Sequence, residues 1–197
     1  ATDGHLSYPF VFEHAGEIWM VPESSDTRSI KLYRATRFPD VWSFEIDLVG
    51  DVEASDPTLV HEAGCWWLMA TVRDHGGSFS DALYLWSAPA LFGPWTPHAA
   101  NPVLVDISAA RPAGRCVRRD GRLIRPVQDC RRGYGAALGL AEVTRLDAEG
   151  FDQQHLATLQ AGEPWRGRRL HTLNRAGNLE CIDGSGVSIK AQAWWVQ

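Results

Sequence analysis

The sequence of 197 residues lacks the features that would assign it quickly to several large classes of protein. It contains no run of 18 apolar residues, so no membrane-spanning helix is predicted. The N-terminus shows no charged-then-apolar pattern of a signal peptide. The formal net charge is -5 and no long basic run occurs, which argues against a surface built to bind nucleic acid.

Cysteine is also scarce, and the four in the chain are Cys65, Cys116, Cys130 and Cys181. They form no CxxC pair, and no histidines lie at zinc-finger distances from them, so we expect neither a metal nor another cofactor. A turn at residues 120–121 would place Cys116 opposite Arg125, so no cross-strand disulfide is implied. Buried reduced thiols are the default expectation and fit a cytoplasmic protein.

Helical periodicity is nearly absent, since only residues 141–148 have weak helical character. One basic cluster occurs, at residues 115–119 with Arg122 and Arg125. It flanks a predicted hairpin turn, and a solvated hairpin rim is favoured over a binding surface.

A hairpin pattern recurs along the chain. SYPFVFEHAGEIWMVPES (residues 7–24) and SDPTLVHEAGCWWLMAT (residues 55–71) both place Gly seven residues after Pro and Trp three residues after Gly. ARPAGRCVRRDGRLIRPVQD (residues 110–129) repeats the pattern with two extra residues, and HTLNRAGNLECIDG (residues 171–184) keeps the glycine but loses the proline. A second pattern, SIKLYRATRFPDVW (residues 29–42), recurs as residues 82–95. Each unit therefore holds two hairpins of short strands rich in β-branched and aromatic residues.

Four-stranded units at this period predict an all-β fold, a five-bladed β-propeller, because one such sheet cannot bury both faces alone. A sandwich or a barrel would not need the same hairpin to recur. We expect one domain over residues 1–197, with units at about residues 5–52, 53–107, 108–162 and 163–197. The last unit is partial, so the propeller is expected to be incomplete in this chain, closed by residues 191–197, or closed by another chain.

Tryptophans recur at equivalent places in the units, as Trp19 and Trp67, and as Trp42 and Trp95. Core packing between blades is favoured for these four over sugar stacking.

Function is expected at one rim of the central channel. The first strand of each blade lines the channel and the second returns beside it, so residues before the first strand and after the second meet. This geometry brings together Tyr8, Glu23, Asp56, Arg73, Arg111, Gln128, Asp129 and His171. Such a mixture of carboxylates, cations and hydrogen-bonding groups suits a polyhydroxylated ligand better than an apolar one.

Glycoside hydrolysis needs two carboxyl groups, one protonated and one ionised. Asp56 is the candidate for the ionised member and Glu23 for the acid. Arg111 and Asp129 are expected to orient the sugar, with His171 assisting. Structural roles compete with these assignments, since Asp before Pro initiates turns and Arg111 would be satisfied by pairing with Asp56 alone.

These motifs resemble the five-bladed propellers of glycoside hydrolase families 43 and 32, in which Asp-Pro opens blades and Gly-Pro-Trp closes them, as at residues 56–57 and 93–95. Residues 5–24, 111–129 and 171–180 more closely resemble the N-terminal propeller domain of plant glucosamine inositolphosphorylceramide transferases and related bacterial proteins. The resemblance spans about residues 5–184.

The hydrolase resemblance implies a catalytic Asp in the first blade, a second Asp in the next and a later Glu acid. Only Asp56 matches, because Tyr8 and Arg111 stand at the other positions before proline. If the usual first blade precedes Ala1, Asp56 is a later site residue and not the base. In the transferase relatives, the resemblance implies that sugar transfer belongs to another domain.

Two functions are therefore expected. The first is a glycoside-hydrolase-like propeller that processes a glycosidic bond, and the second is a non-catalytic propeller that binds a carbohydrate or sugar phosphate and accompanies a glycosyltransferase. A protein-interaction propeller without a small ligand is a third, weaker hypothesis. An open ring leaves apolar blade faces uncovered, which predicts a homodimer or closure by Trp194 and Trp195.

Overall fold

The structure, a computed structural model, describes residues 5–74, 76–162 and 167–186. Within these residues the chain forms strands and one 3-10 turn, Ser25–Thr27, and no α-helix. The strands are β1 (Ser7–His14), β2 (Glu17–Glu23), β3 (Ser29–Arg37), β4 (Val41–Gly50), β5 (Ala54–Glu62), β6 (Cys65–Val72), β7 (Ala82–Ala88), β8 (Thr96–Pro97), β9 (Leu104–Val105), β10 (Val117–Arg119), β11 (Arg122–Asp129), β12 (Ala137–Asp147), β13 (Gly150–Gln160), β14 (Gly167–Ala176) and β15 (Leu179–Gly186).

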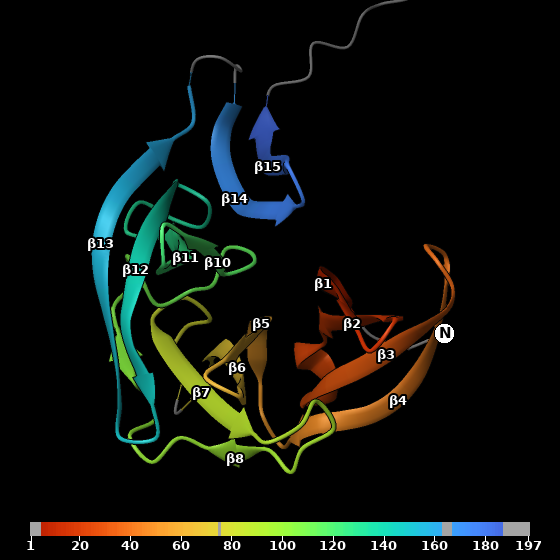
Figure 1. Cartoon of the computed structure of the whole chain (residues 1–197). Coiled ribbons are helices and arrows are strands. Elements are labelled where there is room, and N and C mark those ends of the chain that lie inside the picture. Colours follow the sequence, from red (N-terminus) through yellow and green to blue (C-terminus); the bar gives the residue numbers. More distant parts are fainter. Residues whose placement is uncertain (1–4, 75, 163–166, 187–197) are drawn as a thin grey trace, which may run out of the picture.

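Antiparallel pairing divides these strands into four sheets. The first contains β1 to β4 in order, the second β5 to β8 with β9 beside β7, the third β10 to β13, and the fourth β14 and β15. The sheets are arranged around a common centre (Figure 1). The expected β-propeller of four-stranded antiparallel blades is confirmed, and the described sheets do not close into a ring.

The hairpins repeat because the same turn repeats. At residues 15–16, 63–64 and 120–121, the first residue has φ between 50° and 53° and the glycine after it has φ of 77° or 78°. Two consecutive residues with positive φ define the tight hairpin turn whose twist matches that of the flanking strands. Glycine adopts this conformation without a steric penalty, which explains its recurrence.

The hydrophobic core lies between neighbouring sheets. One cluster joins the first and second sheets around Trp19 and Leu68, and a second joins the second and third sheets around Leu85. A smaller cluster joins the third and fourth sheets around Leu138 and Leu170. Each sheet therefore depends on its neighbours for burial, as radial stacking requires.

The recurring tryptophans fit this packing with one exception. Trp19 and Trp67 are buried, and Trp95 packs against the first cluster. Trp42 is half-buried at the outer edge, where its Nε1 donates to the Pro39 carbonyl oxygen at 2.9 Å.

Two local expectations are wrong. Residues 141–148 are not helical, because β12 covers almost all of them and pairs with both β11 and β13. Strand pairing overrides a weak helical preference there. Arg125 does not belong to a solvated rim, because it is 1% exposed and donates to the carbonyl oxygen of Ala109 at 2.8 Å.

The cysteines differ in burial and are all free of disulfides. Cys116 and Cys130 are buried as expected, Cys65 is half-buried, and Cys181 is exposed. No helix in the part of the chain that the structure describes has the length and apolar character needed to cross a membrane. Trp194 and Trp195 lie outside the described residues, and the homodimer stays a prediction.

Candidate ligand-binding site

The site begins with two irregular strand starts. Tyr8 and Asp56, each directly before a proline, have φ of 43° and 54°, in the left-handed region that non-glycine residues rarely adopt. The pairing of β1 with β2 shifts between Ser7 and Phe10, and that of β5 with β6 shifts between Ser55 and Thr58. A bulge of this kind redirects the side chain at its centre.

Asp56 is held by one side chain from the third sheet and one from the segment that leads into that sheet. The Arg111 Nε donates to the Asp56 Oδ2 at 2.6 Å, and the Gln128 Nε2 donates to the same oxygen at 3.0 Å. The Asp56 side chain is 3% exposed, so this ion pair is screened little by solvent.

Glu23 supports the same cluster from the end of β2. Its Oε2 accepts the backbone N–H of Asp56 at 3.2 Å and lies 4.0 Å from the Arg111 Nη2. Two carboxylates thus share one guanidinium. Burial raises the pKa of Asp56 to about 7; Arg111 opposes this rise and Glu23 adds to it. Asp56 is therefore partly protonated near neutral pH, whereas the sequence predicts Asp56 as the ionised carboxyl group of the pair.

Tyr8 ties the first sheet to the third. Its hydroxyl hydrogen-bonds the Thr58 Oγ1 at 2.9 Å and accepts the backbone N–H of Gly114 at 2.6 Å. Burial raises the pKa of the Tyr8 hydroxyl, so it stays neutral. Gly114 is required for this approach, because a Cβ there would lie 2.1 Å from the Leu173 carbonyl oxygen.

An aromatic stack forms the opposite side of the site. The Tyr134 ring lies 4.7 Å from the Arg111 guanidinium carbon and stacks on the His171 ring with centroids 4.8 Å apart. The His171 Nδ1 lies 3.5 Å from the Asp183 Oδ2. Tyr134 is 46% exposed, so part of its ring is available to a ligand.

A cavity of about 320 Å³ lies between these groups. Its lining includes Tyr8, Asp56, Tyr134, His171 and Asp183. These residues come from all four sheets and their connections, so the cavity exists only because the sheets stack. Of the eight predicted site residues, Tyr8, Asp56 and His171 line the cavity, and Glu23, Arg111 and Gln128 lie behind Asp56.

Arg73 and Asp129, the other two predicted site residues, are engaged elsewhere. The Arg73 Nε donates to the Glu53 Oε2 at 2.8 Å, and the guanidinium covers the Phe79 ring. Asp129 accepts from the Arg131 Nη2 at 2.6 Å, which lowers the pKa of Asp129. Successive residues of a strand point to opposite faces, so Asp129 points away from the face on which Gln128 contacts Asp56.

Tyr134 and Asp183 were missed by sequence reasoning. The signal for Tyr134 was an aromatic residue between two glycines, Gly133 and Gly135, in the loop after β11. Asp183 also has a signal, since it follows the repeated hairpin turn in the fourth unit. Within residues 5–74, 76–162 and 167–186, no three His, Cys, Asp or Glu side chains are grouped so that they could hold a metal ion.

Comparison with known proteins gives a family and a fold. The family described as "Glucosamine inositolphosphorylceramide transferase 1, N-terminal" matches residues 1–184. The glucosamine inositolphosphorylceramide transferase 1 of Oryza sativa subsp. japonica is 36% identical over 196 residues, which is 93% of this chain and 26% of the relative. The chain thus spans about a quarter of the length of that curated relative.

Solved structures share the fold at low sequence identity. An α-L-arabinofuranosidase from Clostridium thermocellum has a TM-score of 0.63 at 12% identity, over 94% of this chain and 65% of the other. The exo-β-1,3-galactanase from Phanerochaete chrysosporium, solved with β-1,3-galactotriose, has a TM-score of 0.62 at 9% identity, over 92% of this chain and 44% of the other.

Proposed function

The chain belongs to the N-terminal domain family of glucosamine inositolphosphorylceramide transferase 1, and we propose that it is a propeller that binds a carbohydrate. The single observation that carries the proposal is the cavity in which a buried carboxylate, Asp56, and an exposed aromatic ring, Tyr134, line the same space. Carboxylate oxygens accept hydrogen bonds from sugar hydroxyls, and aromatic faces pack against the apolar faces of sugar rings. The relatives are named glucosamine inositolphosphorylceramide transferase 1, and the sugar in that name supports a sugar ligand.

Asp56 is pre-organised for this task. Arg111 and Gln128 both bind its Oδ2, so the carboxylate is held in place before a ligand binds. A carboxylate already fixed in place loses little further freedom when a ligand binds.

Tyr134 supplies the apolar contact. Its ring contacts both the Arg111 guanidinium and the His171 ring, so it is positioned without a ligand. Tyr134 remains 46% exposed, and this exposed part is what a sugar would contact. The Tyr134→Ala variant is expected to weaken sugar binding about threefold to tenfold, the value of one aromatic contact.

The test is calorimetric titration with glucosamine, β-1,3-galactotriose and xylotriose. The matched control is Phe44→Ala, because Phe44 is 50% exposed on β4 and does not line the cavity. Equal losses in the two variants, or no binding of any sugar by the wild-type chain, would remove the proposal.

Glycoside hydrolysis is the second candidate, favoured by the two carboxylates that share Arg111 and by the pKa of Asp56 at about 7. A group with such a pKa is able to donate a proton near neutral pH. Against it, Asp56 lines the cavity and Glu23 does not. Hydrolysis predicts that Asp56→Asn and Glu23→Gln each abolish turnover of an oligosaccharide while sugar binding persists. Binding without turnover by the wild-type chain would reject hydrolysis and leave the first proposal intact.

A further inference from the structure

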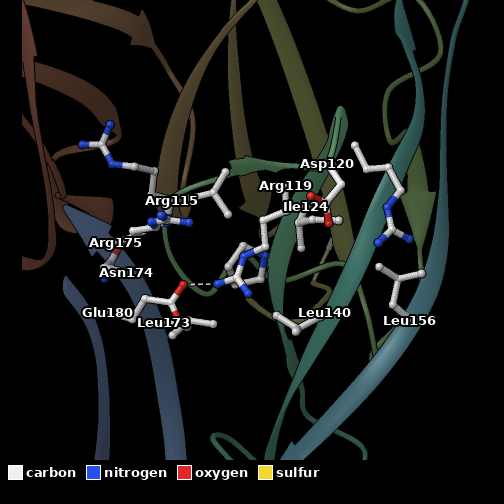
Figure 2. Close-up of a pocket in the computed structure, with 13 residues that line it drawn as sticks. Arg115, Arg119, Asp120, Ile124, Leu140, Leu156, Leu173, Asn174, Arg175 and Glu180 are labelled. Atoms are coloured by element: carbon white, nitrogen blue, oxygen red, sulfur yellow. Dashed lines mark hydrogen bonds and ion pairs between the residues drawn. The ribbon is translucent and has the colours of Figure 1, made fainter. Parts of the chain in front are cut away.

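The strand β11 presents one face to the fourth sheet and the other to the second sheet. Ile124 and Pro126 line a cavity of about 280 Å³ between the third sheet and the β14–β15 hairpin, where Figure 2 shows Ile124. Successive residues of a strand point to opposite faces, so Arg125 points away from this cavity. Leu123, on the same side as Arg125, belongs to the core cluster that joins the second and third sheets. An arginine therefore stands where the strand pattern places a core side chain.

The Arg125 guanidinium is buried without a carboxylate. Arg125 is 1% exposed, and no Asp or Glu of residues 5–74, 76–162 and 167–186 pairs with it. Its Nε has no hydrogen-bond partner among the same residues. Burial lowers the pKa of Arg125 to about 10, so the group stays charged at neutral pH. A buried charge without a counter-ion is costly, so the contacts that Arg125 does make have to offset this cost.

Those contacts are with the segment that leads to Arg111. The Arg125 Nη1 donates to the Ala109 carbonyl oxygen at 2.8 Å, and its Nη2 donates to the Ala110 carbonyl oxygen. The Arg125 Nη1 also donates to the Gln153 Oε1 on β13 at 3.0 Å. The Gln153 Nε2 in turn donates to the Ala109 carbonyl oxygen at 3.2 Å. One planar guanidinium thus fixes two consecutive carbonyl groups directly before Arg111.

The far end of the same segment is bound to β11 as well. The Gln128 backbone N–H donates to the Arg111 carbonyl oxygen at 2.9 Å. The backbone of Arg111 is thus fixed on both sides, while its Nε lies 2.6 Å from the Asp56 Oδ2. A backbone shift of about 1 Å would take that contact beyond hydrogen-bond range. The position of residues 109–111 therefore decides whether Arg111 reaches Asp56.

We propose that Arg125 is a positioning residue of the candidate site, which holds the backbone of residues 109 and 110 so that Arg111 reaches Asp56. Arg125 does not line the Asp56 cavity, so it acts through Arg111. Lysine cannot take this role, because its ammonium is a point charge on a flexible stem, whereas guanidinium presents donors in a rigid plane. The effect on sugar binding rests on the proposed function, and the link from Arg125 to Asp56 does not.

The test follows the carboxyl group of Asp56 by 13C NMR titration of the full chain, with Asp56→Asn to identify its signal. Arg111 opposes the rise in the Asp56 pKa that burial causes. Displacement of Arg111 should therefore raise this pKa by about one unit or more. We expect the shift in both Arg125→Met and Arg125→Lys. The lysine variant keeps the positive charge, so a shift there is an effect of geometry.

Two further variants complete the set. Gln153→Leu removes one contact of Arg125 and one of the Ala109 carbonyl oxygen, so it should produce a smaller shift in the same direction. Leu32→Ala is the matched control, because Leu32 is fully buried in the core between the first and second sheets. Loss of its packing should destabilise the chain and leave the Asp56 titration unchanged.

Calorimetric titration with the sugars named above adds the functional readout. If the proposed function holds, both Arg125 variants should bind sugar about threefold to tenfold more weakly, the value of one hydrogen bond to a charged group. If the wild-type chain binds no sugar while the Asp56 pKa shifts in both variants, the proposed function fails and the positioning role stands.

Three results would overturn the positioning role. The first is an Asp56 titration that does not shift in Arg125→Met and Arg125→Lys, or in Gln153→Leu where neither Arg125 variant folds. The second is a shift in Arg125→Met alone, which would mean that the charge of Arg125 acts on Asp56 directly. The third is an equal shift in Leu32→Ala, which would mean that any loss of stability disturbs the Asp56 cluster.

Discussion

The Arg111→Met variant probes the buried cluster behind the proposed carbohydrate site. The Arg111 side chain is 10% exposed and lies 2.6 Å from Asp56, which is more buried still. Removing one partner of a buried ion pair costs about 3–5 kcal/mol, because the other charge is left buried without compensation. We expect a loss of this size in the free energy of unfolding at pH 8. At that pH, Asp56 of the variant is either ionised without its buried partner or protonated at a pH where a free carboxyl group is ionised.

The loss should be smaller at low pH. The pKa of Asp56 is about 7 in the folded chain, against about 3.9 when unfolded. The folded state thus binds more protons between these values, and the contribution of Asp56 to stability falls as the pH rises from about 4 to about 7. Without Arg111 the pKa of Asp56 rises further, so Asp56 is neutral at pH 5. The wild type is protonated at Asp56 below about pH 7 as well, so only the variant keeps this proton between about pH 7 and pH 8. Since one pH unit corresponds to about 1.4 kcal/mol, we expect the loss to be about 1 kcal/mol smaller at pH 5 than at pH 8.

Urea unfolding followed by tryptophan fluorescence at pH 5 and pH 8 measures both quantities. Asp56→Asn is the control, since it removes the titrating group. The double variant Asp56→Asn/Arg111→Met should be destabilised by less than the sum of the single variants, because the two side chains interact directly. A loss in Arg111→Met that is identical at both pH values, or strict additivity in the double variant, would refute the reasoning.

Two further predictions concern packing. Gly114→Ala should destabilise the chain by about 3 kcal/mol, because its Cβ would collide with the Leu173 carbonyl oxygen. Gly121→Ala meets no neighbour and should cost about 1–2 kcal/mol from its positive φ alone. Thermal unfolding of the two variants compares these costs, and equal costs would contradict the close approach of Gly114 to Leu173. A thiol reagent should label exposed Cys181 rapidly and buried Cys116 only on unfolding, because burial raises the pKa of Cys116 to about 11. Equal labelling rates in the native chain would contradict the burial of Cys116.

The fold was predictable because its determinants are local and repeated. The glycine of each hairpin turn marks a conformation with positive φ. Its recurrence at residues 16, 64 and 121 is enough to predict the repeating unit without knowledge of any long-range contact. The weak helical pattern at residues 141–148 misled because β12 is paired on both sides, which outweighs local preference.

The site was only partly predictable, because strand ends were located but side-chain directions were not. Glu23 and Gln128 turn toward Asp56, whereas Asp129, one residue beyond Gln128, points to the opposite face and pairs with Arg131. Tyr134 occupies a loop without periodicity, and only the folded chain brings its ring over Arg111.

The contacts around Asp56 explain why Glu23 lies behind the cavity and not in its lining. A non-glycine residue with φ of 54° before a proline is strained, and such strain persists only where several contacts fix it. Glu23 binds the Asp56 backbone N–H, while Arg111 and Gln128 bind its side chain. The second carboxylate thus holds the strained backbone, and the first carboxylate is thereby placed in the lining of the cavity. The pairing of acidic residues at this rim therefore follows from the need to aim one carboxylate, whether or not any bond is cleaved there.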